Sequence, residues 1–392
     1  MGEDGRSGAR VAPSPPQSPL PRERLAVDDR GYMGRALELA RRGLGLASPN
    51  PAVGAVVVAD GRVVGEGWHE GPGTPHAEVV ALRAAGGRAR GATLYSTLEP
   101  CDHQGRTPPC TRAIVAAGVA RVVVAMPDPN PIVDGRGIRA LREAAIGVDL
   151  GVGEPEARRL TEAYAKHVVT GLPFVTLKLA ATLDGKVAAR DGSSRWITGE
   201  DARADAHRLR AAADAIAVGA GTALADDPAL TVRDPAYRGA RKLRVLVDAR
   251  GRVPARGRLF DGSAPTLVAT TEAAPRGARE AWRETGADVV VLPMEEGGGV
   301  SVPALLEHLG KRDLQHLLLE GGPTLAFAAV AAGCVDRLVL YLAPKLLGGT
   351  DAPGALGGPG FAPVGEAVGL AIRSVARLGP DLKVEADVHR DR

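Results

Sequence analysis

Apolar and polar positions in the first part of the chain switch repeatedly between helical spacing and strand spacing. Helical spacing covers 28–43, and two apolar runs within 52–68 flank Asp60-Gly61, a dipeptide typical of a β-hairpin turn. Helix-like and strand-like segments then alternate, at 76–86, 91–100, 110–119 and 120–129. The order α, β, β, α, β, α, β predicts a three-layer α/β/α sandwich.

A polar segment over 154–173, which closes with Gly171 and Pro173, predicts a helix followed by a domain boundary. A second alternating series starts there. Helices are predicted at 198–213, with Thr198 and Asp201 as a capping box, at 302–310 and at 323–333. Strands are predicted at 173–188, 214–220, 243–249, 266–270, 287–293, 316–322, 336–344 and 382–388. This alternation predicts a second, doubly wound α/β domain.

Length and composition indicate the number of domains and the cellular compartment. A length of 392 residues fits two domains, which we expect at 28–171 and 172–392, after a disordered, proline-rich tail over 1–27. The balance of 49 basic and 46 acidic residues gives no reason to expect a nucleic-acid partner. Three cysteines cannot form a disulfide framework, which favours a cytoplasmic protein, and no apolar run is long enough for a membrane helix.

Two of the three cysteines lie in one short segment, "TLEPCDHQGRTPPC". Cys101 follows a predicted strand and Cys110 opens a predicted helix, as does His76 in "PHAE". One imidazole and two thiolates leave a fourth position open on a tetrahedral Zn²⁺, which is typical of catalytic zinc. Glu78 lies two residues beyond His76 and could move protons between a bound water and a leaving amine. This pattern predicts a zinc-dependent deaminase.

The spacing of the cysteines distinguishes this segment from the shorter P-C-x-x-C pattern of many zinc deaminases. Eight residues separate Cys101 and Cys110, so the spacer must form a loop, and Arg106 and Thr107 are suited to contact phosphate or ribose. Taken alone, a His-Ala-Glu triplet is typical of a surface helix, and two cysteines are typical of a buried core. A deaminase acting on another pyrimidine or purine, and a non-catalytic binding protein, remain alternatives at this point.

Five motifs together resemble the bifunctional deaminase/reductase family of riboflavin biosynthesis: "SPNPAVGAVVV", "PHAEVVALRAAG", the cysteine segment, "LKLAATLDGKVA" and "VDRLVLYLAPKLLGG". The resemblance implies a cytidine-deaminase-like first domain and a dihydrofolate-reductase-like second domain. It also implies one Zn²⁺ per chain, NADPH, a phosphoribosyl-aminopyrimidine substrate and a homo-oligomer, either a dimer or a tetramer. The first reaction would release ammonia from the pyrimidine, and the second would reduce its ribosyl side chain.

Carried over position by position, the resemblance makes His76, Cys101 and Cys110 the zinc ligands and Glu78 the proton shuttle. Asn50 would hydrogen-bond the pyrimidine or the ribose. Asp102 departs from the family, which usually has Ser or Asn there.

The second domain lacks the G-x-G-x-x-G fingerprint of dinucleotide-binding folds. The segment "LLLEGGPTLA" offers a substitute, because a strand, a Gly-Gly turn and a helix start can hold a pyrophosphate on backbone N–H groups. Arg210 and Arg233 are suited to the substrate phosphate, and Arg250 and Arg252 permit a contact to the 2′-phosphate of NADPH.

The resemblance assigns further contacts in this domain. Cofactor contacts would be made by Ala180, Trp196, Thr222, Asp226, Gly322, Pro323 and Thr324. Substrate contacts would be made by Ser194, Arg210, Leu230, Arg233 and Glu320. A separate hypothesis rests on the residues themselves: Lys178 or Asp184, both in "LKLAATLDGK", could assist protonation in the reductase or orient the imine of the ring-opened sugar.

Overall fold

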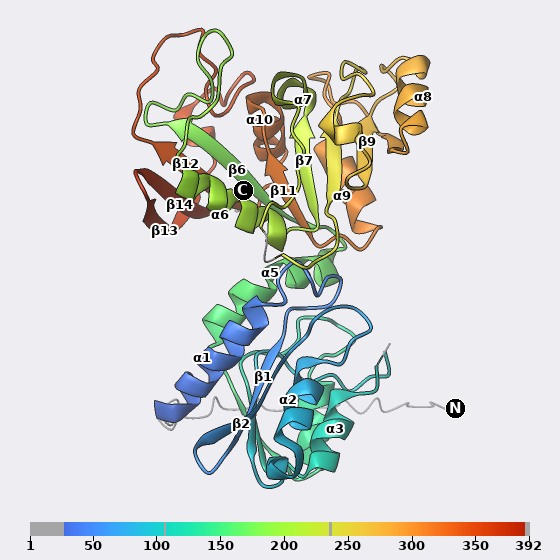
Figure 1. The fold of residues 1–392 in the computed structure, drawn as a ribbon, viewed down its shortest axis with the longest axis vertical. Helices are drawn as coiled ribbons and strands as arrows, with labels where there is room; N and C mark the ends of the chain where they lie inside the picture. Colours follow the sequence, from blue (N-terminus) through green and yellow to red (C-terminus); the bar gives the residue numbers. More distant parts are fainter. Residues whose placement is uncertain (1–26, 106, 235–236, 389–392) are drawn as a thin grey trace, which may run out of the picture.

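The computed structural model describes residues 27–388 except 106 and 235–236. The proline-rich segment 1–27 lies outside the described residues, except for Val27, and so does Arg106. Two lobes follow one another along the chain, and helix α5 (Glu154–Thr170) lies at their junction (Figure 1). No helix within the described residues combines the length and the apolar character needed to cross a membrane.

The first lobe is built on a five-stranded sheet of order β2-β1-β3-β4-β5. β1 runs antiparallel to β2 and β3, whereas β3, β4 and β5 are parallel to each other. The predicted hairpin turn at Asp60-Gly61 connects β1 and β2. The strand bounds are β1 (Gly54–Ala59), β2 (Arg62–Trp68), β3 (Thr93–Ser96), β4 (Arg121–Val124) and β5 (Gly147–Leu150).

Helices cover both faces of this sheet and complete the predicted three-layer sandwich. On one face lie α1 (Val27–Arg41) and α5; on the other lie α2 (Ala77–Ala85), α3 (Cys110–Ala117) and α4 (Arg136–Glu143), with a short 3₁₀ turn at Gly86–Ala89. The sequence prediction omits α4 and β5. β5 carries no fully buried residue, so it lacks the apolar run that marks the other strands.

The second lobe is built on a nine-stranded sheet of order β10-β9-β8-β7-β11-β6-β12-β14-β13. The seven strands from β10 to β12 are parallel, as the alternating pattern predicts, and β14 and β13 add an antiparallel edge. The strands are β6 (Phe174–Thr182), β7 (Ala215–Gly219), β8 (Leu243–Val247), β9 (Thr266–Thr270), β10 (Asp288–Val291), β11 (His316–Glu320), β12 (Arg337–Ala343), β13 (Leu370–Leu378) and β14 (Asp381–Val388).

Helices pack on this second sheet, and three features differ from the sequence prediction. α7 forms within 218–233, which reads as a loop, and neither α8 nor β13 is predicted. α8 buries only Trp282 and β13 is exposed along most of its length, so both lack apolar periodicity. The bounds are α6 (Glu200–Ala212), α7 (Ala220–Asp226), α8 (Arg276–Glu284), α9 (Val302–Gly310) and α10 (Pro323–Ala331), with 3₁₀ turns at Arg258–Phe260 and Val364–Glu366.

The predicted capping box of Thr198 and Asp201 is wrong. Gly199 is the N-cap of α6 and no side chain caps the helix. The backbone N–H of Gly199 instead donates to Asp381 Oδ2 across 2.7 Å, so a residue from the far end of the chain fixes this helix start.

Candidate functional sites

Three predicted zinc ligands come together in the first lobe. His76 is the N-cap of α2, Cys110 is the first residue of α3, and Cys101 lies in the loop between β3 and α3. His76 Nδ1 lies 3.2 Å from Cys110 Sγ and 3.5 Å from Cys101 Sγ. All three ligand atoms lie within 4.8 Å of one another. The two helix starts and the loop therefore bring the three donors to one point.

These three donors fit Zn²⁺. A tetrahedral zinc with bonds of about 2.3 Å to sulfur and about 2.0 Å to nitrogen requires donor atoms about 3.5 Å apart, as they are here. Without a metal, hydrogen bonds join these groups, and a bound metal ion would take the place of the protons in those bonds. The hydrogen bond with Cys110 lowers the pKa of Cys101, and the same bond raises the pKa of Cys110. Bound Zn²⁺ would keep both sulfurs as thiolates.

Glu78 lies beside this cluster, in the first turn of α2. Its side chain is buried, with 3% of the residue exposed, and its Oε2 lies 3.6 Å from Cys110 Sγ. Ser96 Oγ donates to Oε1 across 3.3 Å. Burial raises the pKa of the Glu78 carboxyl, which suits a group that must both accept and return a proton.

The spacer between the two cysteines supports the cluster. Thr107 Oγ1 lies 3.2 Å from His76 Nε2, so the ring nitrogen that faces away from the cysteines has a partner, as ligating histidines require. Asp102 accepts a hydrogen bond from the Thr111 hydroxyl in the first turn of α3. The acidic residue that departs from the family pattern therefore holds the loop to the helix.

Asn50 lies between the zinc ligands and a cavity at the boundary of the two lobes. Its Nδ2 lies 2.9 Å from Nε2 of His69, and the ring of His69 makes an edge contact with the ring of His76, with centroids 5.2 Å apart. Asn50 also borders a cavity of about 250 Å³ between the two lobes. The predicted substrate residue is therefore one side chain away from the metal ligands.

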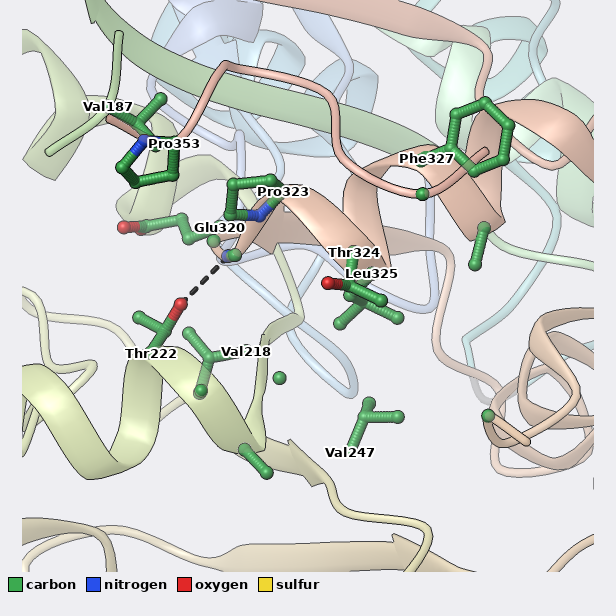
Figure 2. A pocket seen from close by; sticks show the side chains of 18 of the residues that line it. Val187, Val218, Thr222, Val247, Glu320, Pro323, Thr324, Leu325, Phe327 and Pro353 are labelled. Atoms are coloured by element: carbon green, nitrogen blue, oxygen red, sulfur yellow. Dashed lines mark hydrogen bonds between the residues drawn. The ribbon is translucent and has the colours of Figure 1, made fainter. Parts of the chain in front are cut away.

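The second lobe contains a much larger cavity, of about 1170 Å³, above the carboxyl ends of its parallel strands. Figure 2 shows Thr222 of α7 and Pro323 and Thr324 of α10 around the same space. This position is where open α/β sheets bind ligands, and the volume exceeds that of an ordinary single-ligand pocket, about 300–1,000 Å³. The predicted residues that line it are Lys178, Ala180, Ser194, Arg210, Thr222, Asp226, Leu230, Glu320, Gly322, Pro323 and Thr324.

The Gly-Gly turn lies at the floor of this cavity. Gly322 is the N-cap of α10, and its N–H donates to Thr222 Oγ1 across 2.8 Å (Figure 2). Gly321 has φ +134, and a Cβ there would lie 3.1 Å from Thr222 Oγ1. The turn therefore approaches α7 closely. The Gly322 N–H is taken by Thr222 and Pro323 has no N–H, so the N–H groups that a phosphate could bind at this helix start are those of Thr324 and Leu325, two residues that line the cavity.

Three charged side chains meet on the cavity wall. Lys178 on β6 is the register neighbour of Glu320 on β11, and both nitrogens Nε and Nη2 of Arg210 donate to Glu320, at 2.6 and 2.9 Å. Burial lowers the pKa of Lys178. Burial is the largest single effect on Glu320 and opposes its ionisation, but the charge and hydrogen bonds of Arg210, together with the charge of Lys178, lower the pKa of Glu320 overall.

Among the described residues, three predicted site residues do not line this cavity: Trp196, Arg233 and Asp184. Trp196 is 63% exposed and packs under the Arg203 guanidinium, whose carbon lies 4.6 Å from the ring centroid. Arg233 is exposed, and its backbone N–H donates to His207. Asp184 is exposed and accepts hydrogen bonds from the Thr182 hydroxyl and from two backbone N–H groups of 347–348.

Sequence reasoning missed two segments that complete the cavity, 295–300 and 353–359. The first segment is two glutamates followed by three glycines and a valine, the second consists mostly of Gly and Pro, and neither contains a recognisable binding or catalytic motif that could have marked it. Arg250 and Arg252, the candidates for a 2′-phosphate contact, do line the cavity.

A thiolate–imidazole cluster with a buried carboxylate defines the first lobe as a zinc-dependent deaminase, and the second lobe has the architecture of a reductase domain. Two family models match in agreement with this class. Residues 26–126 match the cytidine and deoxycytidylate deaminase zinc-binding region, and residues 173–384 match the RibD C-terminal domain.

Whole-length relatives make the assignment specific. The riboflavin biosynthesis protein RibD of Escherichia coli (strain K12) is 44% identical over 367 residues, which cover 91% of this chain and 98% of that protein. RibD of Aquifex aeolicus (strain VF5) is 43% identical over 358 residues, 91% of this chain and 97% of that protein. A solved structure of Acinetobacter baumannii RibD has a TM-score of 0.83 and 38% identity, and covers 93% of this chain and 99% of its own.

The chain therefore belongs to the RibD family, and the resemblance seen in the motifs is confirmed. It is a bifunctional enzyme of riboflavin biosynthesis, with a zinc-dependent deaminase and an NADPH-dependent reductase. A Thermotoga maritima structure, with a TM-score of 0.81 and 36% identity over 92% of this chain and 99% of its own, is described as a diaminohydroxyphosphoribosylaminopyrimidine deaminase/5-amino-6-(5-phosphoribosylamino)uracil reductase.

Proposed function

We propose that the first lobe removes the 2-amino group of 2,5-diamino-6-(5-phosphoribosylamino)pyrimidin-4(3H)-one, and that the second lobe reduces the resulting 5-amino-6-(5-phosphoribosylamino)uracil to its ribitylamino form. The observation that carries this proposal is the presence on one chain of a His-Cys-Cys cluster beside buried Glu78 and of a cavity large enough for a dinucleotide with a second ligand. The two lobes correspond to 28–171 and 172–392.

In the deaminase, His76, Cys101 and Cys110 would hold Zn²⁺, which supplies a water of lowered pKa when bound. Glu78 takes a proton and returns it to the departing ammonia, and the burial that raises the pKa of its carboxyl favours the protonated form in this exchange. Asn50 orients the substrate. Its Nδ2 is engaged by His69, so its Oδ1 is the acceptor that it offers to an N–H or O–H group of the substrate.

In the reductase, the turn at Gly321-Gly322 and the start of α10 hold the phosphates of NADPH, and Thr222 fixes that turn. The cofactor supplies the hydride when bound. Lys178, on the cavity wall beside Glu320, is the better candidate for handling the substrate proton, because Asp184 is exposed and its carboxylate is held by backbone N–H groups outside the cavity. Arg210 binds Glu320 and keeps it ionised.

One assay tests the two-step reaction. Purified protein would receive the diaminopyrimidinone phosphate with and without NADPH, while ammonia release and absorbance at 340 nm are followed together. We expect ammonia in both samples and NADPH oxidation that begins only after deamination. Ammonia without NADPH oxidation would contradict the reductase half. Deamination of cytidine or adenosine, with no dependence on the 5′-phosphate, would favour a deaminase of another substrate class.

Two further properties belong to this proposal. We place the enzyme in the cytoplasm, where the free thiols of Cys101 and Cys110 stay reduced for zinc. We also propose a homo-oligomer, because the edge strand β13 exposes aliphatic side chains, with Ile372 68% and Val375 60% exposed. Size-exclusion chromatography with light scattering would measure the mass of the protein in solution, and the mass of a monomer would contradict this part of the proposal.

A further inference from the structure

The loop that carries Asn50 belongs to the deaminase lobe but rests on the reductase lobe. Residues 43–51 connect the end of α1 with β1. Two carbonyl groups of this loop accept hydrogen bonds from reductase side chains: Gln315 Nε2 donates to Pro49 O across 2.5 Å, and Lys242 Nζ donates to Gly45 O across 2.7 Å. Both donors are buried, with Gln315 5% and Lys242 7% exposed.

The loop also touches the reductase lobe with its backbone. Gly45 has φ +70, and a Cβ at this position would lie 1.8 Å from the carbonyl oxygen of Ala211 in α6. A Cβ at Gly239 would lie 2.4 Å from a methyl group of Leu46. The reductase surface therefore fits the loop so closely that no side chain separates them at these points.

The donor at Gln315 is itself fixed by the reductase sheet. The backbone N–H groups of Gln315 and His316 both donate to Asp214 Oδ2, at 2.8 and 2.9 Å, and β11 starts at His316. The position of Gln315 is thus set by two parallel strands, β7 and β11, because Asp214 directly precedes β7. The reductase sheet therefore fixes the Gln315 side-chain amide, which donates to the loop of the deaminase lobe.

From Pro49 the contact continues to the metal ligands. The next residue, Asn50, donates through Nδ2 to Nε2 of His69, and the other ring nitrogen of His69 lies 3.2 Å from the carbonyl oxygen of Pro75. A carbonyl only accepts, so His69 Nδ1 carries the proton and Nε2 accepts from Asn50. The hydrogen bond to His69 therefore fixes the orientation of the Asn50 amide. The backbone just before Asn50 is fixed in turn by the hydrogen bond from Gln315 to Pro49 O.

We propose that Gln315 and Lys242 of the reductase lobe are positioning residues for deamination, and that they act by fixing the loop that presents Asn50 to the deaminase substrate. This inference rests on the proposed role of Asn50. The cavity of about 250 Å³ between the lobes, which borders Asn50, gives the loop room to move when the two donors are lost. Without them the substrate would bind more weakly, while the proton transfers of Glu78 would continue.

The test uses the full-length, zinc-loaded enzyme with substitutions that preserve side-chain size. Gln315→Met removes the N–H donor without adding a charge to this buried position, and Lys242→Met removes the amine but keeps the aliphatic chain. We expect each variant to raise the deaminase KM about tenfold, as the loss of one oriented hydrogen bond does, with kcat within about twofold. Lys242→Arg keeps a donor and should restore the KM.

The matched control is Lys166→Met, which breaks another contact between the lobes. Lys166 Nζ lies 2.7 Å from Asp336 Oδ2 and joins α5 of the deaminase lobe to the residue directly before β12 of the reductase lobe. Its deaminase KM should stay at the wild-type value, and all variants should oxidise NADPH normally when given the deaminated substrate. An equal rise in KM for Lys166→Met, or no rise for Gln315→Met and Lys242→Met, would overturn the proposal.

Hydrogen exchange followed by mass spectrometry provides a second measurement that does not depend on activity. Amides at 46, 47 and 50 donate within the loop, and they should exchange at least about fivefold faster in Gln315→Met and Lys242→Met than in Lys166→Met or wild type. Unchanged exchange in all variants would contradict the positioning role. If the wild-type enzyme does not deaminate the proposed substrate, the proposed function fails, and this exchange experiment still decides the role of the two residues.

Discussion

The metal cluster of the first lobe and the cavity of the second lobe are built in opposite ways. Three donors within 4.8 Å, supplied by two helix starts and one loop, make the deaminase centre small and buried. The reductase cavity extends over about 1170 Å³, and its walls come from segments between Lys178 and Pro359. Chemistry concentrated in a few side chains suits a metal reaction. Binding of a large cofactor requires surface, most of it backbone and aliphatic.

This difference teaches that single substitutions should act unequally in the two sites. In the cluster every side chain has a chemical duty, so removing one group stops the reaction. In the cavity many weak contacts share the binding, so most single changes should have smaller effects, with Lys178 as the exception that the geometry identifies.

The largest effect is expected for Glu78→Gln. The carboxamide keeps the volume but cannot shuttle a proton, so the deamination rate should fall by at least about 10³-fold. Zinc content, measured by elemental analysis, should stay at one per chain because Glu78 is not one of the three donors. Reduction of the deaminated substrate should be unchanged. A variant that retains a tenth of the deaminase activity would contradict the role of Glu78.

A smaller but still large effect is expected for Lys178→Met, which keeps the length of the side chain and removes its amine. The reductase rate should fall about 10²-fold, at the lower end of losses from missing proton transfer, while deamination stays normal. Asp184→Asn is the matched control, because Asp184 is exposed and lies outside the cavity-lining set. Loss of reduction in the control and not in Lys178→Met would reverse the assignment.

The pH profile of reduction should sharpen the same contrast. Burial lowers the pKa of Lys178 below its ordinary value of 10.5. The charged amine, which can donate a proton, is therefore lost as pH rises through a value below 10.5, and the reductase rate should fall there. Lys178→Met should lack this step in its profile. A wild-type rate that stays constant up to pH 10.5 would exclude Lys178 as the donor.

The smallest effect is expected for Thr222→Val in the phosphate-binding turn. Valine has the same shape but cannot accept the hydrogen bond from the N–H of Gly322, now 2.8 Å from Thr222 Oγ1. The KM for NADPH should rise by no more than about tenfold, with kcat nearly constant, because one neutral hydrogen bond among many contacts is lost. A change in deaminase KM instead would show that the two sites are coupled through α7.

The two sites were also unequally predictable. The deaminase site could be predicted from the sequence as His76, Glu78, Cys101 and Cys110. Zinc binding requires particular residue types, and the chain has only 3 cysteines and 8 histidines. In the reductase, Trp196 was predicted from the resemblance, Arg233 from the resemblance and its guanidinium, and Asp184 from its carboxylate; among the described residues these three do not line the cavity. A phosphate site made of backbone N–H groups requires few particular side chains, so the sequence contains little that identifies it.

The sequence by itself determined the two alternating α/β series, the hairpin at Asp60-Gly61 and the identity of the metal donors, because periodicity and ligand chemistry are local properties. Only the tertiary structure decided which distant segments meet. Gly199 caps α6 with help from Asp381, and Gln315 donates to Pro49, 266 positions away along the chain, in the loop that carries Asn50. Such contacts depend on how strands order in a sheet and how lobes dock, and no short-range pattern records that.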